Sequence, residues 1–302
     1  MVARIPSTDA RTSIGIWQDY NASLISRELS FASGLFGFTS VRVMLNALVY
    51  SLDAPRFLQH YEHFLASCAA HNLTAMPVLF DADFPNCDTP GCANPDKDFI
   101  TQKRYINSSW CPSPGAKVVD DATKWSRLEP FVEAVAGGRY ANDGRIAALE
   151  MMNEPRESSA SPFLAHFAAF VGKISSRPIA VEPQYTPPPK AALDAASVLS
   201  YHTYWCTFGC MNSTYTHLAA AAAQHDRTAV NVELGGRPPQ GGQPYCDAIQ
   251  GVLAACVGYY AWELMLGRDQ FDTGTPRFQG LVWPNGSVYD ANEADCIRRA
   301  NA

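Results

Sequence analysis

The stretch R-I-A-A-L-E-M-M-N-E-P-R at residues 145–156 decides how the rest of the chain is interpreted. Residues 146–152 form a short, mostly apolar run after a turn-forming N-D-G, which is typical of a buried strand in a parallel sheet. Pro155 has no backbone N–H and disfavours helix at Glu154, so the strand should end there. An amide and a carboxylate, Asn153 and Glu154, are therefore predicted at the carboxyl end of a buried strand. They are either a satisfied polar pair or part of a functional site.

Apolar runs and amphipathic segments alternate along the whole chain. Strands are predicted at residues 13–17, 41–45, 73–80, 146–152, 178–181, 198–201, 228–232 and 257–261. Helices are predicted between them at residues 24–35, 55–70, 121–136, 161–175, 217–225 and 245–255. Eight strands that alternate with helices predict a (β/α)8 TIM barrel, whose functional site lies at the carboxyl ends of the strands. No linker or composition shift divides the chain, so residues 1–302 are expected to form one domain.

Composition and charge exclude several classes of partner. The 302 residues are 47% hydrophobic and 17% charged, which is ordinary for a globular protein. The net charge is −6 and no run of Lys or Arg occurs, so nucleic acid and anionic membrane surfaces are not expected partners. No apolar run approaches the roughly 20 residues that span a bilayer, and the first ten residues do not resemble a signal peptide. We expect a monomer whose partner is a small or polymeric substrate.

Cysteines and glycosylation sequons favour an extracellular protein. The chain has nine cysteines, including the close pairs Cys87/Cys92 and Cys206/Cys210. Neither pair has the spacing of a zinc site, so we predict a Cys206–Cys210 disulfide and a bridge from Cys87 to Cys92 or Cys111. The odd count leaves a free thiol, for which Cys68 and Cys256 are the candidates. Five Asn-x-Ser/Thr sequons, at Asn21, Asn72, Asn107, Asn212 and Asn285, add to the expectation of a secreted glycoprotein whose signal peptide has been removed.

Polar and aromatic side chains collect at the carboxyl ends of the predicted strands. They are Arg42, Asp81, Asn153, Glu154, His202, Tyr204, Glu233 and Trp262. Two carboxylates that face each other, Glu154 and Glu233, are what cleavage of a glycosidic bond requires, because one must donate a proton and the other must attack or stabilise the anomeric carbon. A buried Arg42 requires a carboxylate partner and could hold Glu233 ionised.

These residues resemble clan A of the glycoside hydrolases, in particular glycoside hydrolase family 5 and its unclassified cellulase-like relatives. The resemblance rests on V-R-V at 41–43, N-E-P at 153–155, H-T-Y at 202–204, V-E-L-G at 232–235 and A-W-E at 261–263. The segments V-L-F-D at 78–81 and N-S-S-W-C-P-S-P-G at 107–115 are similar to parts of the cellulase-like relatives. The resemblance runs from the first predicted strand to the end of the chain.

The resemblance implies a retaining β-glycosidase without cofactor or metal. Glu154 would be the general acid/base and Glu233 the nucleophile, and the expected substrate-binding residues are Arg42, Asn153, His202, Tyr204, Trp262, Asp81 and Trp110. Two positions depart from the family pattern. Glu263 is a third carboxylate beside Trp262 with no assigned role, and Asp81 stands where many members keep a histidine nearby.

Most other titratable residues are expected to have structural roles. The remaining histidines are expected on the surface or satisfied, and their spacing predicts no zinc site. Glu150 is expected to face the barrel interior or a helix and to require a partner, while Asp81 and Asp83 are candidates for substrate contact.

Three functions remain open from sequence. The leading one is hydrolysis of a β-linked polysaccharide or oligosaccharide, with β-glucan or β-mannan ahead of xylan. A transglycosylase would use the same covalent intermediate, with a sugar hydroxyl in place of water. A catalytically silent carbohydrate-binding protein is disfavoured because both Glu154 and Glu233 are present.

Overall fold

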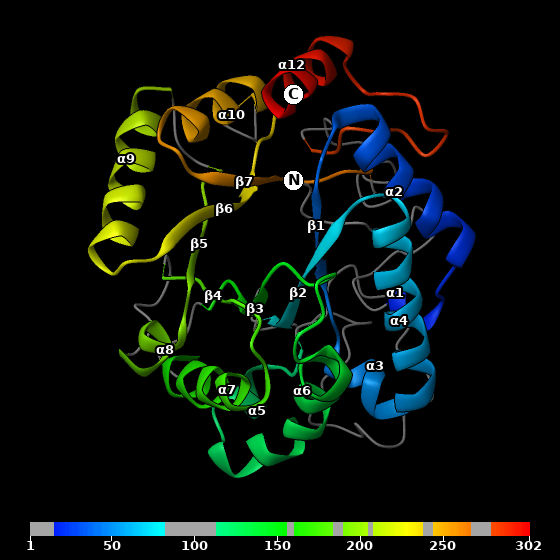
Figure 1. Cartoon of the computed structure of the whole chain (residues 1–302), viewed down its shortest axis with the longest axis vertical. Helices are drawn as coiled ribbons and strands as arrows, with labels where there is room; N and C mark the ends of the chain where they lie inside the picture. Colours follow the sequence, from blue (N-terminus) through cyan, green and yellow to red (C-terminus); the bar gives the residue numbers. More distant parts are fainter. Residues whose placement is uncertain are drawn as a thin grey trace.

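The structure is a computed structural model that describes residues 15–81, 113–155, 160–183, 190–204, 208–237, 244–266 and 279–302. Its described residues contain seven strands: β1 (Ser40–Met44), β2 (Thr74–Asp81), β3 (Leu149–Asn153), β4 (Ile179–Val181), β5 (Val198–His202), β6 (Thr228–Leu234) and β7 (Gly258–Ala261). All neighbours are parallel and follow the chain order β1 to β7. The strands form a nearly closed barrel surrounded by helices (Figure 1), which confirms the predicted (β/α)8 TIM-barrel fold.

Helices connect the strands and form the outer layer (Figure 1). They are α1 (Gly15–Gln18), α2 (Ala22–Phe36), α3 (Ala47–Leu52), α4 (Ala54–Ala70), α5 (Ala116–Val119), α6 (Glu129–Ala136), α7 (Ala160–Ile174), α8 (Lys190–Ala195), α9 (Phe208–Gln224), α10 (Tyr245–Ala254) and α12 (Ala291–Asn301). Two 3-10 helices, η1 (Ala122–Arg127) and η2 (Gly138–Tyr140), flank α6. The helix predicted at 121–136 is thus η1 followed by α6, and Pro130 lies in the first turn of α6, where its missing N–H costs nothing.

The strand predicted at residues 13–17 is wrong for its described part. Residues 15–18 form helix α1, while residues 13 and 14 lie outside the described residues. Trp17 is buried against Phe57, Tyr61 and Phe64 of α4, and its indole N–H donates to the Met44 carbonyl at 2.7 Å. A short apolar run does not distinguish a buried strand from a buried helical turn, and packing of the Trp17 ring decides between them here.

The barrel interior is filled by residues that alternate along the strands. A buried interior cluster contains Met44, Met76, Val78, Ala148, Ala180, Val232, Tyr260 and Trp262. The first and last strands approach each other through the Ser40 and Tyr260 hydroxyls, which are 3.0 Å apart. A second, larger apolar layer lies between strands and helices and includes Leu29, Phe64, Phe131 and Phe167. The interior layer extends to the carboxyl ends of β1 and β7, where Met44 and Trp262 lie.

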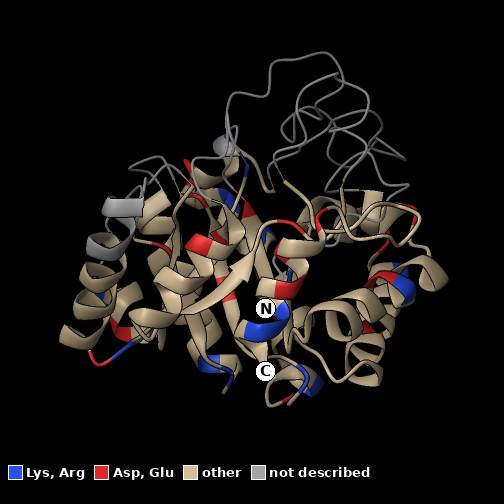
Figure 2. Ribbon diagram, turned by 90° about the horizontal axis from the view of Figure 1, so that it is seen from above, with Lys and Arg blue, Asp and Glu red and all other residues tan. Residues whose placement is uncertain are grey.

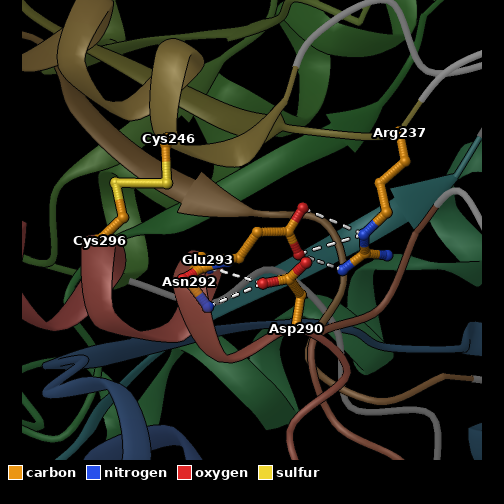
Figure 3. Close-up of a disulfide and its surroundings, with 6 residues drawn as sticks. All are labelled: Arg237, Cys246, Asp290, Asn292, Glu293 and Cys296. Carbon is orange, nitrogen blue, oxygen red and sulfur yellow. Dashed lines mark hydrogen bonds and ion pairs between the residues drawn. A yellow bond between two sulfur atoms is a disulfide. The ribbon is translucent and has the colours of Figure 1, made fainter.

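Helix α12 is joined to the barrel by a disulfide and an ion pair. Cys246 of α10 is bonded to Cys296 of α12, with their Cα atoms 5.8 Å apart (Figure 3). Arg237, just after β6, forms an ion pair with Glu293, and its guanidinium lies 3.9 Å from the Tyr289 ring centre. Asp290 caps the helix by accepting the backbone N–H groups of Asn292 and Glu293 (Figure 3).

The predicted disulfides involve Cys87, Cys92, Cys111 and Cys206, which lie outside the described residues. Within the described part, both candidates for the free thiol, Cys68 and Cys256, are free, and Cys68 is buried.

Charges of both signs are distributed over the helices and strands rather than collected in one segment (Figure 2). Every helix in the described part of the chain is too short or too polar to span a bilayer.

Candidate active site

The carboxyl ends of the strands bring the predicted polar residues together. Hydrogen bonds and ion pairs link Arg42, Asn153, Glu154, His202, Tyr204 and Glu233. Trp262 belongs to the interior cluster, against which Tyr204 also packs. Trp110 and Asp83, also named from sequence, lie outside the described residues.

Arg42 forms the centre of this network from inside the barrel. Its side chain is 1% exposed, and its Nε, Nη1 and Nη2 donate to three different partners. These are Glu150 Oε2 at 2.5 Å, Glu233 Oε1 at 2.6 Å and Asn153 Oδ1 at 2.9 Å. Burial alone would lower the pKa of Arg42, but the two carboxylates outweigh it and raise that pKa above its ordinary value. The expected carboxylate partner of Arg42 is confirmed, and there are two.

Glu150 faces the barrel interior, as one of the sequence alternatives proposed. Its Oε1 accepts a hydrogen bond from Ser200 Oγ at 3.0 Å while Oε2 binds Arg42. Both Glu150 oxygens are therefore occupied by hydrogen bonds, and Glu150 lies four residues before Glu154 in the chain. Glu150 compensates the buried guanidinium, which would be costly without it.

The position of Glu233 depends on an irregularity in β6. The parallel register pairs Tyr201 with Asn231 and then His202 with Glu233, so the strand contains one extra residue at this point. The extra residue interrupts the alternation that keeps Val232 in the interior cluster, and it turns Glu233 towards the barrel axis. The Glu233 backbone N–H is held by Asn231 Oδ1 at 3.3 Å.

Both oxygens of the Glu233 carboxylate are held by donors. Oε1 accepts from Arg42, and Oε2 accepts from the Tyr204 hydroxyl at 2.5 Å. His202 Nδ1 is 3.5 Å from Oε2. Burial, followed by the negative charge of Glu233, raises the pKa of Tyr204 far above its ordinary value, so Tyr204 stays a neutral donor. These contacts fix the orientation of the Glu233 carboxyl group.

Glu154 lies in a different environment. It follows β3 directly and has φ = 43°, a left-handed conformation that is uncommon for a residue with a side chain. Its backbone N–H donates to Glu182 Oε2 at 2.8 Å, and its Oε1 is 2.9 Å from His202 Nδ1. Arg42 forms its ion pairs with Glu150 and Glu233. One oxygen of Glu154 and one of Glu233 lie within 4.8 Å of each other.

Asn153 connects the network to β2. Its Nδ2 donates to Asp81 Oδ1 at 3.1 Å, and its Oδ1 accepts from Arg42. Asp81 also exchanges backbone hydrogen bonds with Ser113. Asp81 therefore fixes the orientation of the Asn153 amide, whose second N–H can still donate to another group.

Glu182 was not recognised from the sequence. It follows β4, is fully buried, and its Oε2 lies 3.8 Å from His202 Nε2. Burial raises the pKa of Glu182, His202 opposes it, and the neighbouring Glu150 and Glu154 add to it, so that the pKa of Glu182 is about 8. The sequence does contain a signal for Glu182, because V-E-P at 181–183 has the same strand–glutamate–proline pattern as N-E-P at 153–155.

His202 joins the two halves of the site. Burial alone would lower its pKa, but Glu182, Glu233 and the hydrogen bond to Glu154 raise the pKa of His202 to about 9. The ring therefore carries a positive charge at neutral pH, the second one in the cluster beside Arg42.

One oxygen of Glu154, one of Glu233 and one ring nitrogen of His202 converge within 4.8 Å, a donor set that could hold a cation. The sequence spacing predicted no such convergence. The Arg42 guanidinium on Glu233 disfavours a cation there, because it already neutralises that carboxylate.

Comparisons with known proteins give structural matches. No protein-family model matches the sequence, and no curated protein matches it significantly. An endo-1,4-beta-mannanase from Rhizomucor miehei superposes with a TM-score of 0.67 and 13% identity, over 96% of this chain and 92% of that one. A glycoside hydrolase family 5 mannosidase from the same organism gives 0.65 and 13%, over 99% and 91%. A GH5_18 protein from Streptomyces cattleya in complex with Manb1-4GlcNAc gives 0.63 and 15%, over 99% and 80%.

At these identities the likeness concerns the fold. The chain has the barrel of family 5 mannanases and mannosidases over nearly its whole length, and the resemblance expected from the sequence is confirmed at that level.

Proposed function

We propose that the chain is a retaining β-glycoside hydrolase that acts on a β-linked, mannose-containing polysaccharide or oligosaccharide. The observation that carries the proposal is the pair Glu154 and Glu233, whose nearest oxygens lie within 4.8 Å in different electrostatic surroundings. Retaining glycosidases hold their two carboxyl groups about 5–5.5 Å apart, whereas inverting ones need about 6.5–9.5 Å to admit a water molecule. The short separation supports direct attack by a carboxylate.

Glu233 is the nucleophile in this proposal. Arg42 and Tyr204 keep its carboxylate ionised and oriented, and one oxygen attacks the anomeric carbon. Glu154 donates its proton to the glycosidic oxygen as the bond to the leaving sugar breaks. A glycosyl ester on Glu233 remains, with inverted configuration at the anomeric carbon.

Glu154 changes its role in the second step. Once Glu233 is a neutral ester, its charge no longer opposes ionisation of Glu154, and His202 stabilises the Glu154 carboxylate through Nδ1. Glu154 takes a proton from water, and the hydroxide attacks the anomeric carbon and releases Glu233. Two inversions give net retention.

The remaining residues orient the sugar. The second Nδ2 proton of Asn153 is available for the 2-hydroxyl, because Asp81 and Arg42 fix the amide orientation. Trp262, 8% exposed at the end of β7, offers an aromatic face for a sugar ring. Asp81 acts through Asn153 rather than on the substrate.

The substrate class follows from the neighbours. Several proteins with this barrel are described as mannanases or mannosidases, and one is bound to Manb1-4GlcNAc, which supports a mannose-containing substrate over β-glucan. Secretion and glycosylation belong to the same proposal. The Cys246–Cys296 disulfide and the exposed sequon residues Asn21, Asn72 and Asn285 are compatible with them.

The test is a screen of β-mannan, glucomannan, β-glucan and xylan with product analysis and NMR of the first-formed anomer. The wild type should release mannose-containing products with retained β configuration. E154Q and E233Q should release little or none. The matched control is E28Q, which removes a buried carboxylate of α2 outside this cluster and should keep wild-type activity. An α-configured first product, or equal activity of all four proteins, would refute the proposal.

A further inference from the structure

Glu182 is a buried carboxyl group that the proposed reaction does not use. It is 0% exposed, its Oε2 accepts the Glu154 N–H at 2.8 Å, and the same oxygen lies 3.8 Å from His202 Nε2. Its Oε1 has no hydrogen-bond partner among the described residues. A buried carboxyl group with a partly unsatisfied oxygen is costly, and a neutral residue of similar shape would avoid that cost.

Glu182 reaches Glu154 by two routes. One is the direct hydrogen bond to the Glu154 backbone, which has φ = 43° and is held there by this contact. The other passes through His202, whose opposite ring nitrogen Nδ1 is 2.9 Å from Glu154 Oε1. Glu182 is therefore hydrogen-bonded to the Glu154 backbone and lies within ion-pair distance of the ring that contacts the Glu154 carboxyl.

We propose that Glu182 is a positioning residue that fixes the conformation of Glu154 and keeps a proton on Nε2 of His202, so that Nδ1 remains directed at the Glu154 carboxyl. The inference rests on the role of Glu154 as general acid/base.

The proton placement explains how one histidine can serve both steps. With protons on both ring nitrogens, the ring donates from Nδ1 to a Glu154 oxygen. That oxygen belongs to the acid form in the first step and to the carboxylate in the second, while the proton of Glu154 itself passes to the leaving group. A neutral ring with its single proton on Nε2 could no longer donate to the Glu154 carboxylate, and this is the state that Glu182 disfavours.

The other charged groups of the cluster influence the pair formed by Glu182 and His202. Those that face Glu182 or His202 come from β1, β3, the end of β3 and β6: Arg42, Glu150, Glu154 and Glu233. Arg42 lowers the pKa of His202, but the carboxylates oppose it, and among them Glu182 contributes most to raising the pKa of His202 to about 9. Removal of the Glu182 charge should therefore lower the pKa of His202.

The experiment compares wild type with E182Q on two aryl β-mannobiosides, one with dinitrophenol and one with phenol as leaving group. Cleavage of the phenyl substrate requires proton donation by Glu154, whereas dinitrophenol leaves without it. We expect kcat/KM for the phenyl substrate to fall about tenfold or more in E182Q, and for the dinitrophenyl substrate less than about threefold. A purely structural defect would lower both values equally, and E28Q is the matched control for loss of a buried carboxylate.

A second readout does not depend on turnover. NMR titration of histidine-labelled protein, with the His202 signal assigned from H202Q, should give a pKa for His202 that is about one unit or more lower in E182Q than in wild type. If E182Q does not fold, E182D replaces it. E182D keeps the charge but withdraws it from the Glu154 N–H, and should show the same selective loss on the phenyl substrate with a smaller change at His202.

An unchanged His202 titration together with equal losses on both substrates would overturn the inference. Failure of the proposed function is a different result, because the wild type itself would then cleave neither mannobioside.

Discussion

Glu154 and Glu233 carry the same carboxyl group in different surroundings, and we attribute their opposite proposed tasks to this difference. Glu233 accepts hydrogen bonds from Arg42 and Tyr204 at 2.6 and 2.5 Å, so its negative charge is stabilised. Glu154 is held by His202 and by Glu182 through its backbone. Two carboxyl groups in different surroundings are the arrangement that acid–nucleophile catalysis requires.

Substitution of each carboxylate should therefore have a distinct consequence. Glu233→Ala should lower kcat on the order of 10⁴-fold, and azide should restore activity by giving an α-linked glycosyl azide, because the vacated side admits the anion. Glu154→Ala should retain activity on substrates with good leaving groups, and azide should give the β-linked product. Product NMR distinguishes the two azides. Wild-type behaviour of both variants, or the same azide anomer from both, would contradict the assignment.

Tyr204 is predicted to act through Glu233. Loss of a hydrogen bond to a charged group costs about 1.5–3 kcal/mol, so Y204F should reduce kcat by about 10- to 100-fold with a smaller change in KM. Y50F is the control, since the Tyr50 hydroxyl binds only the Pro130 carbonyl among the described hydrogen bonds, at 3.3 Å, and belongs to a different part of the molecule. Steady-state kinetics with a mannobioside checks this. Equal kinetics for Y204F and Y50F would show that the hydroxyl has no role.

A site residue could be predicted from the sequence wherever a single physical requirement applied to a single position. A buried Arg42 required a carboxylate, and the structure provides Glu150 and Glu233. Glu182 obeys the same strand–glutamate–proline argument as Glu154, but β4 is only three residues long and is a weak strand signal in the sequence. The link from Glu182 through His202 to Glu154 could not be predicted, since it depends on side-chain distances across three strands.

At the scale of elements, periodicity located most of the long helices and buried strands, but the helix predicted at 217–225 begins at Phe208. It failed at residues 15–18, where Trp17 packs onto α4, and it did not predict α12. The irregular register of β6 was also beyond the sequence, because it is defined only by pairing with β5. That irregularity is what turns Glu233 towards Arg42.

Helix α12 gives the prediction that belongs to this scale. The Cys246–Cys296 disulfide closes a segment of 50 residues that contains β7. Replacement of both cysteines by serine should lower the free energy of unfolding by about 2–4 kcal/mol, mainly because the unfolded chain gains freedom. Urea unfolding without reductant measures the change. C256S removes an exposed free thiol and should leave the stability unchanged, and an equal effect of both substitutions would contradict the prediction.

At the scale of the whole molecule, the barrel concentrates its buried ionisable groups at one end. The parallel strands and the interior cluster bring residues from β1, β3, β4, β5 and β6 into contact, although they are spread over nearly 200 positions of the chain. The unfolded chain separates these groups again. Protonation and folding are therefore coupled, and the pH dependence of stability reports on the site.

For Glu182 and His202, the coupling lowers the free energy of unfolding as the pH rises. Glu182 has a pKa of about 8 in place of 4.5, and His202 a pKa of about 9 in place of 6.5, so the folded state holds both protons more tightly than the unfolded state. The stability that Glu182 contributes is complete below about pH 4.5 and is lost as the pH rises through 8. The contribution of His202 is complete below 6.5 and is lost as the pH rises through 9. Glu62 and Asp143 have pKa values lowered by Arg145, so their contributions are lost at acidic pH instead.

The free energy of unfolding should therefore be highest in mildly acidic solution and decrease from about pH 5 to pH 9. In E182Q the decrease should be smaller over this range, because one titrating group is absent and the pKa of His202 falls towards its ordinary value. Urea unfolding at pH 5, 7 and 9 measures both slopes, with E28Q as the control for loss of a buried carboxylate outside the cluster. The prediction is contradicted if the wild-type free energy of unfolding rises between pH 5 and 9, or if the slopes of wild type and E182Q are equal. Either result would show that Glu182 and His202 do not bind their protons more tightly in the folded state than in the unfolded state.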